Sequence, residues 1–137
     1  MNLGISNATI ESIGRAVAQN GPKSGHYGHD NFLLNEGTIV RYKDILSKVF
    51  KDNQLENCAG LELSGKKLTL TLQNLKNETF RFIITVGKNK TGKESKDFTK
   101  IEYGGGNLNP FERIIHGNLW AYEIAEYLNR FLGRVSS

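Results

Sequence analysis

The sequence is poor in the residues that cross-link a chain or carry it through a membrane. It has a single cysteine, Cys58, so no internal disulfide can form and a disulfide-rich secreted scaffold is excluded. No apolar run approaches the ~20 residues that a membrane-spanning helix needs. The N-terminal segment includes the acidic Glu11 and lacks the apolar core of a secretory signal. These absences predict a cytoplasmic protein.

The composition that remains is typical of one folded domain. The chain of 137 residues has the commonest size of a single domain and can bury a core without cross-links. Its hydrophobic residues, 38% of the total, are gathered in runs, which predicts a packed core. Eighteen Lys and Arg residues against fourteen Asp and Glu residues give a net charge of +4. This excess favours an anionic partner without identifying one.

Two segments have the apolar spacing of a helix. The first covers residues 7–19, where Asn7 can cap the helix and Gly21-Pro22 ends it. The second is a helical region over residues 110–132, in which Asn109-Pro110 supplies a cap and a proline at the first helical position. The two segments predict an N-terminal helix and a C-terminal amphipathic helix.

The sheet region, residues 31–103, has the two-residue period of strands. Its clearest pair is KLTLTLQ at 67–73 and TFRFIITV at 79–86, joined by a hairpin loop. FLLNEGTIVRY at 32–42 suggests two more short strands, and the polar segment at 87–100 a long exposed loop. We therefore expect one α+β domain over residues 1–137. Its bent antiparallel sheet or partly open barrel should have the N-terminal and C-terminal helices packed on it.

GKNKTGK at 87–93 matches the phosphate-binding pattern G-x-x-x-x-G-K, but its surroundings do not fit a nucleotide site. The pattern continues with a Ser or Thr that coordinates magnesium, and here the next residue is Glu94, whose carboxylate would repel a phosphate. A helix should follow, whereas the next residues have no helical apolar stripe. We predict a solvated lysine segment and no cofactor.

The same segment contains the densest positive charge of the chain. An exposed lysine segment can adjust to phosphates without a preformed cage, although a purely solubilising role is the alternative. Only Phe98 adds an aromatic ring on which a nucleic-acid base could stack. The partner could thus be a phosphate-bearing ligand or a nucleic acid. The candidate anion-binding residues are Lys66, Lys67, Lys88, Lys90, Lys93 and Lys96.

A second group of candidates has side chains suited to acid–base chemistry. His26 and His29 stand beside Asp30 in a glycine-rich segment, but no further ligand cluster supports a metal site, and we predict none. In a nuclease, His26 and His29 would act together with Arg41 and Arg81.

Three segments resemble the pleckstrin-homology-like fold, which has bacterial members. They are GTIVRYKDI at 37–45, the hairpin of residues 67–86 and the terminal helix that carries Trp120. The resemblance covers residues 32–132 and implies a bent antiparallel sheet closed at one end by the C-terminal helix. The basic signature with which some members hold phosphoinositides is absent, so lipid binding is not implied.

These features favour a non-enzymatic binding module that presents loops to a protein or an anionic ligand. The alternative is a small metal-independent ribonuclease or toxin of the barnase–colicin–RelE kind, because such enzymes join helices to an antiparallel sheet and cleave with scattered side chains. A phage or mobile-element inhibitor that sequesters a partner or a nucleotide is a third possibility. The sequence does not identify the partner or the oligomeric state.

Overall fold

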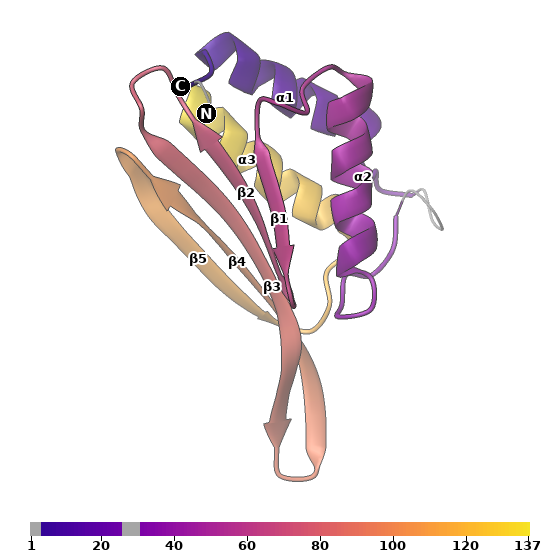
Figure 1. Cartoon of the computed structure of the whole chain (residues 1–137). Helices are drawn as coiled ribbons and strands as arrows, with labels where there is room; N and C mark the ends of the chain where they lie inside the picture. The colour runs from indigo at the N-terminus through magenta and orange to yellow at the C-terminus, as the bar shows by residue number, and fades with distance from the viewer. Residues whose placement is uncertain (1–3, 26–30) are drawn as a thin grey trace.

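The computed structural model describes residues 4–25 and 31–137 and has an α+β architecture with one bent sheet (Figure 1). The helices are α1 (Asn7–Asn20), α2 (Ile39–Asp52) and α3 (Ala121–Ser136). The strands are β1 (Gly60–Ser64), β2 (Lys67–Gln73), β3 (Thr79–Thr91), β4 (Glu94–Gly105) and β5 (Leu108–His116). They form an antiparallel sheet in chain order, and it does not close into a barrel. The expected fold class is confirmed.

The sheet has a covered face, on which the helices pack, and an open face on the opposite side. Leu70 of β2 pairs with Phe82 of β3, and both side chains are buried on the covered face. The residues that alternate with the buried ones along each strand, such as Thr69 and Arg81, point to the open face. Burying a Leu or Phe side chain contributes roughly 1.5–3 kcal/mol, so this alternation fixes the register of the hairpin. The strand pair expected at 67–86 is confirmed.

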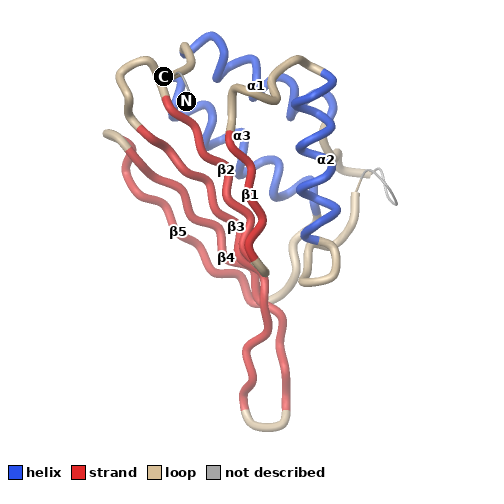
Figure 2. The backbone as a smooth tube through the Cα atoms, in the orientation of Figure 1, coloured by secondary structure: helices blue, strands red, loops and turns tan. Residues whose placement is uncertain are grey.

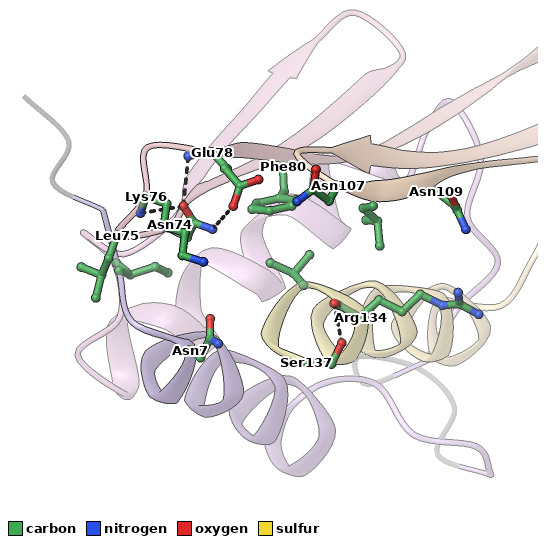
Figure 3. Close-up of a pocket in the computed structure, with 13 residues that line it drawn as sticks. Asn7, Asn74, Leu75, Lys76, Glu78, Phe80, Asn107, Asn109, Arg134 and Ser137 are labelled. Atoms are coloured by element: carbon green, nitrogen blue, oxygen red, sulfur yellow. Dashed lines mark hydrogen bonds between the residues drawn. The ribbon is translucent and has the colours of Figure 1, made fainter.

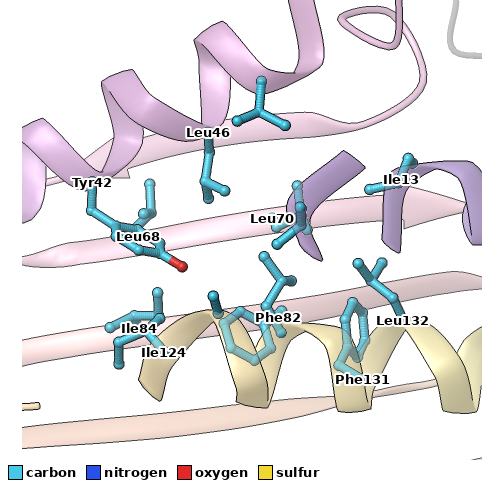
Figure 4. Close-up of a cluster of buried hydrophobic side chains, with 14 of the residues drawn as sticks. Ile13, Tyr42, Leu46, Leu68, Leu70, Phe82, Ile84, Ile124, Phe131 and Leu132 are labelled. Atoms are coloured by element: carbon cyan, nitrogen blue, oxygen red, sulfur yellow. The ribbon is translucent and has the colours of Figure 1, made fainter. Parts of the chain in front are cut away.

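The C-terminal helix α3 lies across the covered face with an aromatic contact at its centre. The Phe131 ring lies 5.6 Å from Phe82 of β3 and 5.5 Å from Tyr103 of β4, measured between ring centroids. Figure 4 shows Phe82 and Phe131 within the buried cluster that also includes Leu70 and Leu132. Helix α1 packs against α3, while α2 contacts β1 at the edge of the sheet. Aromatic packing thus ties the last helix to the middle strands.

Residues 32–42 were expected to form two strands, and this expectation is wrong. The Asn35 side chain accepts hydrogen bonds from the backbone N–H groups of Gly37 and Thr38, which builds a turn. Helix α2 begins directly after this turn. Its buried residues follow a helical spacing. The β-branched residues at the start of the helix are also typical of strands, and they make the segment resemble an alternating strand. They are Ile39, Tyr42, Leu46, Val49 and Phe50.

The helical region expected over 110–132 also needs correction, because its first part is strand β5. Pro110 cannot donate to a ladder, and β5 is an edge strand, where a proline is tolerated. The sheet therefore extends to His116, well past the expected end at residue 103. Trp120 precedes α3 instead of lying within it, and its backbone N–H donates to the Glu123 carboxylate. The N-terminal helix lies where it was expected, although Ser6 caps it in place of Asn7.

Within the described residues, none of the helices has the length and apolar character that crossing a membrane requires.

Candidate functional site

The outer halves of β3 and β4 leave the body of the sheet as a two-stranded hairpin, residues 88–97, which we call the arm (Figures 1 and 2). The neighbouring strands stop below it: β2 pairs with β3 only as far as Thr85, and β5 pairs with β4 only from Phe98. The arm strands pair with each other from Lys88↔Asp97 to Thr91↔Glu94. The long exposed loop expected over 87–100 is therefore wrong, because these residues are paired strands.

The arm forms because its turn fits a tight hairpin. Gly92 has φ +65° at the first position of a two-residue turn, a conformation that glycine adopts without strain and that matches the twist of paired strands. Gly65 has φ +61° in the same position between β1 and β2. In both turns a lysine follows the glycine, so each turn presents a positive charge at a strand end.

The four arm lysines point in different directions. Lys88 and Lys90 continue the alternation of the covered face, Lys96 lies on the open face and Lys93 is in the turn. All four are exposed. The arm also contains Glu94 and Asp97, so its net charge is +2. Among the described residues, ion pairs involve lysines outside the arm, and no arm lysine takes part in one.

The base of the arm is fixed to the body by packing and hydrogen bonds. The Phe98 ring covers the backbone of Gly87, where an added Cβ would lie 2.6 Å from the ring. Asp97 accepts a hydrogen bond of 2.9 Å from the Asn118 side chain. Thr99, fully buried, donates to the Gly117 carbonyl at 3.0 Å. Both hydrogen bonds join β4 to the segment before α3. They therefore fix the direction in which the arm leaves the body of the sheet.

The structure also brings Lys66 and Lys67 to the base of the arm. The backbone N–H of Val86 donates to the Lys66 carbonyl at 3.0 Å, and Lys67 pairs with Thr85. The Lys66 ammonium lies 3.0 Å from a carboxylate oxygen of Glu36 and is thereby partly neutralised. Lys67 adds its charge to the open face.

The nuclease candidates that the structure describes do not come together in one site. Arg41 belongs to α2, where its guanidinium lies 4.3 Å from the centre of the Phe32 ring. Arg81 is on the open face of β3, so the sheet separates the two arginines. His26 and His29 lie outside the described residues. No group of three His, Cys, Asp or Glu side chains within the described ranges could hold a metal ion.

A hollow of about 660 Å³ lies at the end of the sheet opposite the arm (Figure 3). Two of its polar lining residues, Asn74 and Glu78, hold the loop between β2 and β3. The Asn74 carboxamide oxygen accepts from the backbone N–H groups of Lys76 and Glu78, at 3.0 Å each, and its NH₂ group donates to the Glu78 carboxylate. Because the Asn74 and Glu78 side chains bond to each other and Asn74 also bonds to the backbone, they hold the loop, and the arm is the stronger candidate.

Comparison with protein-family models, curated proteins and solved structures gave no match to this chain. The resemblance to the pleckstrin-homology-like fold stays a prediction.

Proposed function

We propose that this protein is a non-enzymatic binding module whose arm binds phosphate-bearing polyanions, nucleic acids in particular. The observation that carries the proposal is the arm itself, a projecting hairpin whose four exposed lysines form no ion pair with any described residue.

The charge on the arm is concentrated enough to act as a unit. Four residues on each arm strand span roughly 13 Å. Residues two positions apart on a strand lie roughly 7 Å apart, which is within the Debye length of about 10 Å at 0.1 M ionic strength, so neighbouring arm lysines act together on a polyanion. Each neutralised phosphate releases counterions, which makes such binding strongly dependent on salt. Glu94 and Asp97 reduce the potential without cancelling it.

The proposal is tested by the salt dependence of binding to a fluorescent oligonucleotide, followed by anisotropy. In the triple variant Lys88→Ala, Lys90→Ala and Lys93→Ala, the magnitude of the slope of log K against log salt should fall between about 50 and 200 mM, by about 2.7 on a DNA duplex or about 2.1 on a single strand, if each lysine meets one phosphate. The matched control changes three exposed lysines away from the arm and removes the same charge. It consists of Lys23→Ala, Lys51→Ala and Lys76→Ala.

The control separates a local site from the overall positive charge of the protein. If the arm binds the polyanion, the control variant retains nearly the original affinity and slope. Equal losses in the two triple variants would contradict the proposal, because the net charge alone would then explain binding.

A further inference from the structure

The lysines of the arm surround it instead of lining one side. Lys88 and Lys90 lie on one face of the ribbon, Lys96 on the other and Lys93 at the tip. A ligand that lay flat against the open face would meet only part of this charge. Phosphates on both sides of the ribbon would meet all of it, and the two backbones that border a groove of a duplex supply this arrangement.

The arm has no surface on which separate bases could stack. Single-stranded nucleic acids are held by aromatic side chains along a positive groove, and residues 88–97 contain no aromatic residue. Phe98 is the nearest ring, and it covers the backbone of Gly87 at the base of the arm. The arm instead offers Asn89 and Ser95, whose polar side chains can hydrogen-bond to base edges.

The width of the ribbon selects the groove. Its strands lie ~4.8 Å apart before side chains are added. The major groove of B-form DNA, about 12 Å wide, admits a two-stranded ribbon, whereas the minor groove is about 6 Å wide. The major groove of A-form RNA is deep and narrow, which hinders entry.

We infer that the polyanion is double-stranded B-form DNA and that the arm enters its major groove. This inference rests on the proposed function and specifies its ligand. With Lys93 leading, the lysines on the two ribbon faces meet phosphates of the flanking strands, and Lys66 and Lys67 lie where the backbone passes the base of the arm.

The charges on the open face limit how far DNA can extend over the body. Lys67 and Lys100 lie in one row across the strands next to the arm base. Glu62, Glu102 and Glu112 form the adjacent row, farther from the arm. This acidic row repels a phosphate backbone, so the contact is confined to the arm and its base.

The experiment uses the full-length protein and varies the ligand. Anisotropy is measured with a DNA duplex, with the same duplex carrying glucosylated 5-hydroxymethylcytosine, with an RNA duplex and with one DNA strand alone. The glucose groups fill the major groove and leave every phosphate in place. We expect the plain DNA duplex to bind best and the glucosylated duplex to bind about tenfold or more weakly, equivalent to about 1.4 kcal/mol. Netropsin, which occupies the minor groove, should leave binding of the plain duplex unchanged.

The other outcomes distinguish this inference from the proposed function. If the plain and glucosylated duplexes bind equally and binding still requires the arm lysines, the arm binds a polyanion but does not enter the major groove. Tighter binding of the single strand, or equal binding of the RNA duplex, would also overturn the inference alone. If none of the four ligands binds at low salt, the inference and the proposed function both fail.

Discussion

The inner and outer halves of the β3–β4 hairpin have the same backbone pairing in very different surroundings. In the inner half, residues such as Phe82 and Tyr103 are buried against α3, and burial holds the strands in register. The outer half, the arm, has no core on either face and relies on the Gly92 turn and on its anchored base. The inner half therefore stabilises the fold, while the side chains of the arm are not needed for the core and are available to a ligand.

The largest expected effect comes from the inner half. Phe131→Ala removes the ring that contacts Phe82 and Tyr103, and it should lower the free energy of unfolding by about 3–5 kcal/mol. The triple lysine variant of the arm should change the same quantity by less than about 0.5 kcal/mol, because its side chains are exposed. Urea denaturation followed by circular dichroism measures both. Comparable losses in the two variants would mean that the arm is part of the stabilising core.

The next effect has the opposite sign and concerns Tyr42 in α2. Its side chain is fully buried, and its hydroxyl has no hydrogen-bond partner among the described residues. An unsatisfied buried hydroxyl costs roughly 1–3 kcal/mol. Tyr42→Phe should therefore leave stability unchanged or raise it by up to about 2 kcal/mol in thermal and urea unfolding. A clear loss of stability would show that the hydroxyl has a bonding partner in solution.

The buried Tyr42 hydroxyl should also make the stability of the protein depend on pH. Burial raises the pKa of Tyr42 above its ordinary value of 10.0. As the pH rises above this ordinary value, the unfolded chain loses the Tyr42 proton while the folded protein keeps it. Ionisation thus favours the unfolded chain, and the free energy of unfolding falls. The stability gap in favour of Tyr42→Phe should widen above pH 10.0. A gap that stays constant through that range would contradict the burial of the hydroxyl.

The sequence predicts the inner half of the hairpin better than the arm. A strand with one buried face has apolar residues at every second position, and this period is visible in the sequence. The pairing of KLTLTLQ with TFRFIITV was predictable, because alternate residues are buried and apolar. The arm was not, because its lysines are exposed on both faces and no apolar residue in 88–97 marks the period of two. Strand β5 was mistaken for a helix start because Asn109-Pro110 has the chemistry of a helix cap, and an edge strand accepts the same proline.

The candidate site was predictable in its residues but not in its shape. The clustering of lysines is visible in the sequence, and so is the failure of the phosphate-loop pattern at Glu94. Which face each lysine occupies depends on the pairing of Asn89 with Lys96, a contact between residues whose own side chains carry no packing signal. The distribution of charge around the arm therefore required the three-dimensional structure.

A moderate effect is expected at the junction of the two halves. Gly87→Ala places a Cβ 2.6 Å from the Phe98 ring, and displacing that ring should cost about 1 kcal/mol in urea denaturation. Adding Phe98→Ala to Gly87→Ala should relieve the clash, so the double variant should be destabilised less than the sum of the single variants. Strict additivity would show that the ring does not rest on Gly87.

The smallest effect tests whether the acidic row opposes binding at the arm. Lys100 lies 3.7 Å from Glu102 and 3.8 Å from Glu112, so both carboxylates compete with a phosphate for its ammonium. In the double variant Glu102→Gln and Glu112→Gln, the lost competition and repulsion should strengthen DNA binding about two- to fivefold, as expected for partly exposed pairs worth about 0.5–1 kcal/mol. The gain should shrink as salt is raised, because exposed charges are screened. Glu11→Gln with Glu126→Gln removes the same charge from exposed positions on α1 and α3, the helices of the covered face, and serves as the control. An equal gain in the control would assign the effect to net charge, and no gain in either variant would place the phosphate path away from Lys100.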